Sequence, residues 1–288
     1  MPASRKLLLG TGLSYHLLEW DGGGDHTVIL LHGFLDNAWG WEPVVDAGLA
    51  AGFHIVAPDL RGHGDSDWLG AGGYYHFPDY LADVHELVSL VGRGRVSLVG
   101  HSMGGSVASY YAGSFPTRVH KLALLEGLGP PESGGSMPER IAIWLAAWKK
   151  VRERSPKSYA TVEEAAGAIA AHDPLVTPEV ARFLAEKGTT TALGGRVRFK
   201  HDPLHATPGP YGFSFATASQ FWSRVRCPTL LVDGAQSVFR HAADEAARRA
   251  ACFADPPRTA TIEGAGHMMQ RHQPARVAAV LRSFLEAA

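Results

Sequence analysis

The chain lacks most features that mark secreted, membrane-spanning and nucleic-acid-binding proteins. Two cysteines in 288 residues are too few for a disulfide framework, which favours a reducing compartment. No uncharged apolar run approaches the ~20 residues that cross a bilayer, and the apolar stretch before Gly10 is too short for a secretory signal. A formal net charge of -1 provides no general attraction to nucleic acid or anionic membranes. These absences predict a cytoplasmic protein without a membrane span.

The chain does contain enough apolar sequence for a sizeable core. Its hydrophobic content of 45% and charged content of 19% are typical of globular proteins. Short apolar runs alternate with segments of helical spacing, which predicts a mostly parallel, twisted α/β sheet with helices on both faces. The predicted strands are 13–20, 27–31, 54–57, 96–99, 122–125, 229–232 and 259–262, and the predicted helices of this core are 80–91, 104–114, 242–252 and 274–285.

The central motif is Gly100-His101-Ser102-Met103-Gly104, which matches the G-x-S-x-G pattern of a nucleophile elbow. Five-residue patterns also arise by chance as ordinary small-residue turns. Here an apolar strand precedes the motif and a helical segment follows it. A turn in that context would raise the Ser102 hydroxyl above the sheet edge, and the Met103 N–H could bind a developing oxyanion. We therefore predict that Ser102 is a nucleophile.

Two other residues that could take part in catalysis come just after predicted strands. Phe34 lies just after the run 27–31, and Glu126 just after the run 122–125. Ligands of parallel sheets bind at the carboxyl ends of the strands. We therefore expect Phe34, Ser102 and Glu126 to meet at one edge. If the protein is a serine hydrolase, the Phe34 N–H is the second oxyanion donor.

The pattern changes between residues 130 and 211, where buried strand runs are absent. Helices are predicted near 137–148, 161–171 and 178–187, followed by a loop over 194–212. We predict a core of 1–129 and 212–288 with residues 130–211 inserted as a helical cap. Trp144 and Trp148 belong to an apolar helical stripe, and we assign them to the substrate pocket. The alternative is that they dock the cap on the core.

Four segments together carry a resemblance to a known family: His32-Gly33, Pro58 to Ser66, the elbow at Ser102, and Gly266-His267. In this order and spacing the chain resembles the α/β-hydrolase superfamily over almost its whole length. The resemblance implies the α/β-hydrolase fold, with Ser102 as nucleophile, His267 as general base, and the Phe34 and Met103 N–H groups as the oxyanion hole. A serine at this position differs from the aspartate of haloalkane dehalogenases and epoxide hydrolases.

Within the superfamily, the chain is most similar to the serine hydrolase-like proteins. The shared segments are His32 to Asn37, Glu126 to Pro131, and Ala181 to Leu184. This resemblance implies no particular substrate.

The acid of the triad departs from the family pattern. Most members carry an aspartate where this chain has Ser237, and a serine cannot stabilise an imidazolium by charge. The candidates are Glu126, Asp233 and Asp244. We favour Glu126, because it ends a buried strand, where an unpaired carboxylate is costly. Asp233 at the end of a strand and Asp244 in the next helix remain alternatives, as does a Glu126 that only caps the inserted segment.

Two further patterns are assigned no chemistry. His201 and His205 have the i, i+4 spacing of metal ligands, but Pro203 would break the helix that this spacing requires. The run 58–67 is expected to be a structural turn in which Asp and Arg satisfy backbone groups and each other.

We therefore expect no metal and no organic cofactor, a small-molecule substrate, and no nucleic-acid partner. The expected function is a serine carboxylesterase that acts on small to medium apolar esters through an acyl-enzyme on Ser102. The alternatives are another reaction on the same triad (C–C bond hydrolysis, perhydrolysis or acyl transfer) or a ligand-binding protein of this fold with little turnover.

Overall fold

The computed structural model describes residues 1–70 and 72–287 and is built on one eight-stranded sheet. The strand order is β1-β2-β4-β3-β5-β6-β9-β10. β1 and β2 pair antiparallel, β2 pairs antiparallel with β4, and all later pairs are parallel. The strands are β1 (Ala3–Leu8), β2 (Ser14–Asp21), β3 (His26–Leu31), β4 (His54–Pro58), β5 (Arg95–His101), β6 (Leu122–Leu125), β9 (Thr229–Gly234) and β10 (Arg258–Ile262).

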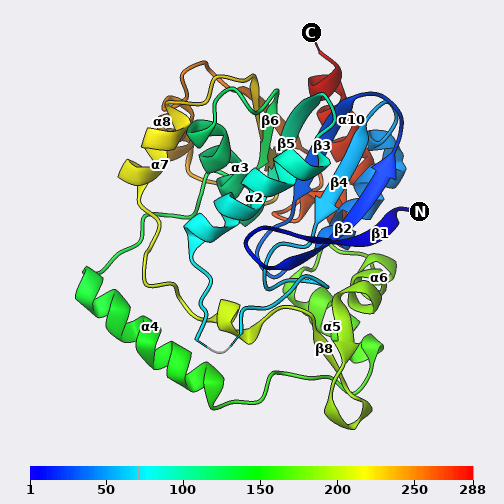
Figure 1. The fold of residues 1–288 in the computed structure, drawn as a ribbon, viewed down its shortest axis with the longest axis vertical. Coiled ribbons are helices and arrows are strands. Elements are labelled where there is room, and N and C mark those ends of the chain that lie inside the picture. The colour runs from blue at the N-terminus through cyan, green and yellow to red at the C-terminus, as the bar shows by residue number, and fades with distance from the viewer. Residues whose placement is uncertain (71, 288) are drawn as a thin grey trace.

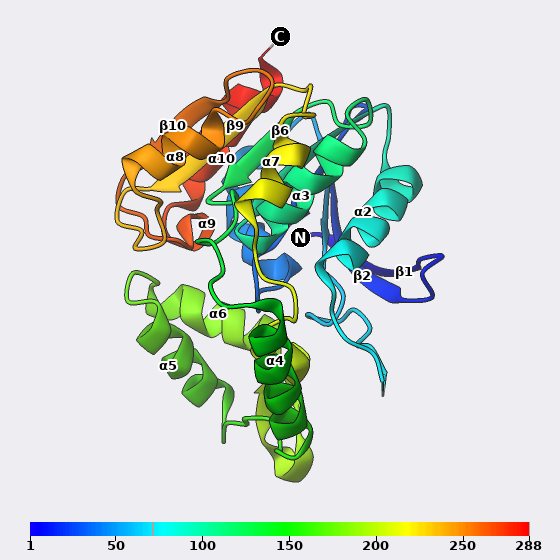
Figure 2. The same ribbon diagram turned by 90° about the vertical axis from the view of Figure 1, so that its left-hand side faces the viewer.

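Helices cover both faces of this sheet (Figures 1 and 2). One face packs against α2 (Phe77–Val91), α3 (Met103–Ser114) and α7 (Phe215–Trp222), with α8 (Ala243–Ala250) beside α7. The other face packs against α10 (Pro274–Glu286), the short α9 (Met269–His272), and helical turns that run from Ala38 to Leu49 and include α1 (Glu42–Val44). The predicted mostly parallel sheet with helices on both faces is confirmed.

All seven predicted strands overlap observed ones, including the mostly exposed edge strand β10. All six residues of β3 and all four of β6 are buried, so their apolar runs were visible in the sequence. β1, an edge strand with one partner and with five of its six residues exposed, was not predicted. The sequence of β1, Ala3-Ser4-Arg5-Lys6-Leu7-Leu8, contains neither an apolar run nor an apolar/polar alternation. Helices α7 and α9 were also missed.

Residues 130–211, which we call the insertion, leave the sheet after β6. They form α4 (Met137–Arg152), α5 (Val162–His172), α6 (Pro178–Gly188), a hairpin of β7 (Thr189–Thr191) and β8 (Val197–Phe199), and short turns at Leu193–Gly195 and Pro203–Ala206. Figures 1 and 2 place them below the carboxyl ends of the parallel strands. The hairpin corrects the expectation of a plain loop after residue 194.

The insertion contains a small apolar core of its own, formed by α5, α6 and β8. Tyr159, Ala165, Val176 and Ala185 are buried in it. Helix α4 differs, because none of its residues is buried. Within the described residues, no helix is both long and apolar enough to cross a membrane.

Candidate active site

Ser102 occupies a strained turn between β5 and α3. Its backbone has φ 51° and ψ −117°, and its N–H donates to the carbonyl of Leu125 at 2.9 Å. A Cβ atom on Gly100 would lie 2.4 Å from the Gly104 carbonyl oxygen, and one on Gly104 would lie 2.3 Å from that of Leu31. Larger residues cannot occupy these positions without moving the backbone. The G-x-S-x-G sequence therefore forms the sharp strand-to-helix turn that it predicts.

Positive φ angles mark three sites at the same sheet edge. Among the described non-glycine residues, Leu35 (φ 58°), Ser102 (φ 51°) and Glu126 (φ 45°) have this conformation. They follow β3, β5 and β6, which are neighbours in the sheet. Each such residue costs about 1–3 kcal/mol, and such strain clusters where function requires it. The edge expected to carry the chemistry is thus also where the backbone strain is concentrated.

Glu126 and His267 form a close pair. The Nδ1 atom of His267 lies 2.6 Å from Oε2 of Glu126, whose side chain is only 4% exposed. Glu126 also accepts from the Gly234 N–H at 3.0 Å and from the Ser237 hydroxyl at 2.8 Å. Burial opposes ionisation of the Glu126 carboxyl, but the hydrogen bonds from His267, Gly234 and Ser237 outweigh it and lower its pKa. The carboxylate is therefore ionised at neutral pH.

An ionised Glu126 determines which nitrogen of His267 carries the proton. A carboxylate only accepts hydrogen bonds, so Nδ1 of His267 must be the donor and Nε2 is left as the basic nitrogen. The Nε2 atom of His101 lies 2.8 Å from the His267 carbonyl oxygen. Burial, followed by the charge of His267, lowers the pKa of His101 to about 3. The neutral His101 ring therefore positions the His267 backbone.

The Ser102 hydroxyl makes no hydrogen bond to His267 or to any other residue that the structure describes. Catalytic hydrogen bonds are often long without substrate and tighten in the complex. Ser102 and His267 both line the same cavity.

The other candidate acids do not meet His267. Asp233 is half-buried in β9 and lines the cavity, but it makes no hydrogen bond to the imidazole within the described chain. Burial, and then the Glu126 charge, raise the pKa of Asp233. Asp244 is exposed in the first turn of α8. Of the three carboxylates considered from the sequence, the structure brings Glu126 to the histidine.

Two backbone N–H groups near Ser102 are free to bind an anion. Met103 is the first residue of α3, so its N–H has no helical acceptor. Neither Met103 nor Phe34 donates its backbone N–H to another atom in residues 1–70 and 72–287. The loop that carries Phe34 is held by His63, whose Nε2 accepts from the Leu35 N–H at 3.2 Å. This role of His63 was not apparent from the sequence, which placed it only in a structural turn.

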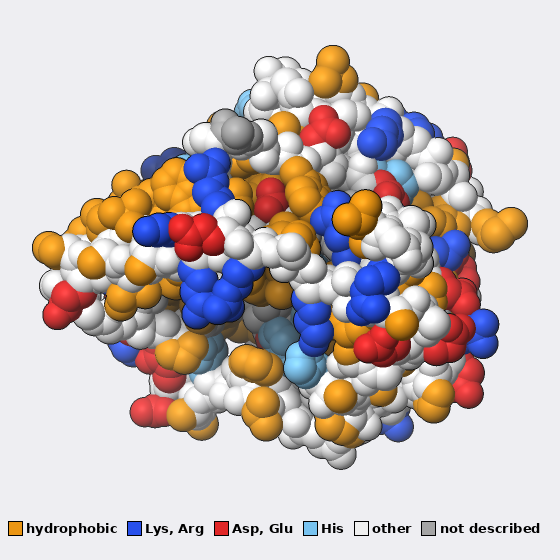
Figure 3. Space-filling view, turned by 90° about the horizontal axis from the view of Figure 1, so that it is seen from below, with side chains coloured by type: hydrophobic (Ala, Val, Ile, Leu, Met, Phe, Trp, Pro, Cys, Tyr) orange, Lys and Arg blue, Asp and Glu red, His pale blue; other side chains and the backbone are white. Residues whose placement is uncertain are grey.

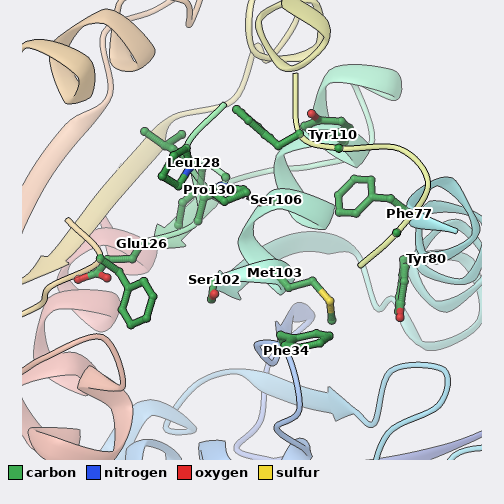
Figure 4. Close-up of a pocket in the computed structure, with 18 of the residues that line it drawn as sticks. Phe34, Phe77, Tyr80, Ser102, Met103, Ser106, Tyr110, Glu126, Leu128 and Pro130 are labelled. Carbon is green, nitrogen blue, oxygen red and sulfur yellow. Dashed lines mark hydrogen bonds between the residues drawn. The ribbon is translucent and has the colours of Figure 1, made fainter. Parts of the chain in front are cut away.

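The cavity at Ser102 has a volume of about 1280 Å³ and a mainly apolar lining that includes several Phe and Tyr rings. Figure 4 shows Ser102 between Glu126 on one side and Phe34 on the other, with Phe77, Tyr80 and Tyr110 beyond. Besides the proposed triad, the polar residues of the lining include Asp233, Arg240 and His241. Such a cavity suits an apolar ligand with a polar reacting centre.

Trp144 and Trp148 are not among the residues that line this cavity. Their rings stack on each other with centroids 5.2 Å apart, and the Trp144 ring meets that of Tyr74 edge-on at 5.1 Å. Tyr74 belongs to the core and does line the cavity. The two tryptophans therefore hold α4 against the core, which is the alternative role that the stripe left open.

The structure does not align His201 and His205 as metal ligands on one helix. Only His205 of the His201–His205 pair lies in the short turn Pro203–Ala206, so no helix aligns the two rings. The single cluster of three metal-type ligands in the described residues is His16, Asp59 and Asp65. His16 bonds to Asp59 and Asp65 to Lys200.

The turn 58–67 is structural, as expected, but its arginine pairs elsewhere. Arg61 donates to Asp83 of α2 at 2.5 and 2.8 Å instead of to an aspartate within the turn.

A family model described as "Alpha/beta hydrolase family" matches residues 28–280. The chain belongs to this family. It is 27% identical to a serine hydrolase-like protein of Danio rerio over 93% of this chain and 83% of that protein. It is 23% identical to a serine hydrolase-like protein of Dictyostelium discoideum over 80% of this chain, and it spans 66% of that protein's length. The resemblance predicted from the motifs is confirmed.

Two solved structures have the same fold as this α/β hydrolase over almost its full length. A hypothetical protein of Pseudomonas aeruginosa superposes with a TM-score of 0.88 at 28% identity and covers 99% of both chains. A thioesterase domain from the curacin biosynthetic pathway superposes with a TM-score of 0.85 at 25% identity, covering 98% of this chain and 99% of that one. Both likenesses span the insertion as well as the sheet.

Proposed function

We propose that this α/β hydrolase is a serine carboxylesterase that cleaves small to medium apolar esters. The observation that carries the proposal is the ionised Glu126 bonded to Nδ1 of His267, beside the elbow serine. In the proposed reaction Ser102 Oγ attacks the ester carbonyl carbon and gives its proton to Nε2 of His267. The Phe34 and Met103 N–H groups stabilise the oxyanion, an effect of about 3 kcal/mol for one donor.

The second half of the reaction returns the enzyme to its starting state. The protonated His267 gives its proton to the leaving alcohol as the ester C–O bond breaks, which leaves an acyl group on Ser102. Water then attacks this acyl-enzyme, gives one proton to His267, and releases the acid as the proton returns to Ser102. Glu126 holds the imidazole tautomer and stabilises its charge throughout.

We also propose that the insertion is a cap over a core formed by 1–129 and 212–288. The small apolar core of the insertion supports this division. A contact between the insertion and the loop that carries His267 supports the role of a cap. Asp173 of the insertion lies 2.7 Å from Nε2 of His272, whose Nδ1 accepts from the Gly266 N–H at 3.1 Å. The insertion thereby supports the segment that carries His267. A cytoplasmic location belongs to the same proposal.

A thioester is the second candidate substrate. The thioesterase domain superposes on this chain almost as well as the Pseudomonas protein does. The leaving group would be a thiol, and the acyl-enzyme would be the same. A serine nucleophile also serves C–C bond hydrolysis, perhydrolysis and acyl transfer, so the acceptor must be established by assay.

The test is hydrolysis of p-nitrophenyl esters from acetate to laurate by the wild type and by Ser102→Ala, with matched acyl thioesters beside them. We expect turnover that requires Ser102 and a chain-length optimum set by the apolar cavity. Labelling by a fluorophosphonate probe checks the nucleophile without assuming a substrate. A wild type that hydrolyses no ester and does not label would indicate a binding protein instead of an esterase.

A further inference from the structure

Helix α4 carries large apolar side chains that are only partly covered by the rest of the described chain. Met137, Ile141, Ile143 and Leu145 are 48%, 37%, 59% and 47% exposed. Trp144 and Trp148 of the same helix pack against Tyr74. Met137, Ile141 and Leu145 are spaced four residues apart and form a ridge beside the tryptophans that stays partly open to solvent. A group of apolar side chains on one helix of a folded protein indicates a contact surface.

Basic residues gather where this apolar helix ends. Lys149, Lys150, Arg152, Arg154 and Lys157, which we call the α4 basic cluster, lie within nine residues that contain one acidic residue, Glu153. The contact between Lys149 and Glu153 is long, at 3.9 Å, and exposed. Over the whole chain 27 basic residues are balanced by 28 acidic ones, so the cluster is a local excess of positive charge.

The apolar helix and the basic residues belong to the same side of the molecule. In Figure 1 α4 extends along the lower edge, away from the sheet. The view from below shows Lys and Arg side chains together with apolar side chains around a hollow (Figure 3). Met137, the first residue of α4, also lines the cavity at Ser102, so the exposed apolar surface is continuous with that cavity.

We propose that α4 and its basic cluster bind an anionic lipid surface. The apolar side chains would enter the boundary between head groups and acyl chains, and the basic cluster would contact the lipid phosphates. A polynucleotide would use the charges but leave the apolar side chains in water. A second copy of this chain would gain little, because four side chains on one helix offer far less than the ~800 Å² per partner of a standard interface.

The experiment is co-sedimentation of the full chain with vesicles of phosphatidylcholine alone or mixed with phosphatidylglycerol, at low and high salt. We expect binding to the mixed vesicles, weakening as salt rises, and little binding to phosphatidylcholine. Lys150→Glu with Arg154→Glu should weaken binding by at least about fivefold for each reversed charge. Ile143→Ser with Leu145→Ser should weaken it at both salt concentrations.

Matched controls carry the same changes elsewhere. Arg226→Glu with Arg258→Glu reverses two exposed charges, and Leu90→Ser removes an apolar side chain that is 55% exposed. Circular dichroism verifies folding of each variant. Equal binding by the α4 variants and the controls would overturn the proposal. So would no vesicle binding together with a dimer, seen by light scattering, that Ile143→Ser with Leu145→Ser abolishes. Because no readout uses turnover, the result is independent of the esterase assignment.

Discussion

The hydroxyl of Ser237 lies 2.8 Å from Oε2 of Glu126 and donates a hydrogen bond to it. Position 237 is where the family resemblance leads us to expect the acid of the triad. In the triad that we propose, the carboxylate comes from the end of β6 instead, and Ser237 donates a hydrogen bond to it. β6 and β9 are adjacent parallel strands, with Leu125 paired to Val232. Their ends are therefore close enough for either strand to supply a carboxylate to His267.

This relationship predicts that the carboxylate of the triad can be moved from position 126 to position 237. Glu126→Gln should lower kcat for ester hydrolysis by about 10³–10⁴-fold, because the amide no longer holds the reactive tautomer of His267. Adding Ser237→Asp to that variant should restore part of kcat, which steady-state kinetics would measure. Ser237→Asp alone is the control, and it should raise the Glu126 pKa by setting two carboxylates together. A double variant no faster than Glu126→Gln would show that residue 237 does not reach the imidazole.

Asp233 offers a direct comparison with Glu126. It has no bond to His267 in the described structure, so Asp233→Asn should leave kcat within about threefold of the wild type. Removing its charge should lower the Glu126 pKa further, since Asp233 and Glu126 repel each other. Titration of the Glu126 carboxyl by NMR in the wild type and the variant would show this shift. If Asp233→Asn lost activity while Glu126→Gln kept it, the acid of the triad would be Asp233 instead of Glu126.

His63 should act on the transition state through the loop at Leu35. His63→Ala removes the acceptor of the Leu35 N–H and lets the strained φ of 58° relax, which would turn the Phe34 N–H away from the oxyanion. We expect kcat to fall about 10-fold or more with little change in KM, because the oxyanion exists only in the transition state. His63→Gln, whose amide oxygen can still accept, should recover part of the loss. Unchanged kcat in His63→Ala would separate this loop from catalysis.

Buried neutral histidines should make the protein sensitive to mild acid. Burial lowers the pKa of His26 to about 4 and that of His101 and His205 to about 3. Below about pH 6.5 these residues take up protons in the unfolded chain but not in the folded one, so stability falls as pH falls toward 4. Each contributes up to about 1.4 kcal/mol per pH unit to this slope. Urea unfolding at several pH values measures it.

The control for this prediction is His26→Gln, which removes one titrating group far from Ser102. It should reduce the slope of unfolding free energy against pH by up to about 1.4 kcal/mol per pH unit, the most that one histidine contributes. A free energy of unfolding that stays constant between pH 6 and 4 would contradict the assignment of neutral buried rings.

The local sequence determined the sheet, the elbow and the edge at which the chemistry lies. Parallel strands are buried on both faces, so β3 and β6 appear as continuous apolar runs. The elbow requires small residues at Gly100 and Gly104, so its sequence is restricted. Both signals depend on neighbours in the chain, and both were detected without knowledge of the fold.

Only the tertiary structure decided which groups meet. Glu126 and His267 are 141 residues apart in the sequence. Their contact depends on how β6, β9 and the loop that carries His267 are aligned. Ser237 and His63 became supports of the site through contacts of the same non-local kind. The apolar stripe of α4 was evident in the sequence, but a periodic pattern does not state what covers it. In the structure the stripe divides, with Trp144 and Trp148 against the core and Leu145 facing solvent, because a helix buries only the face that a neighbour reaches.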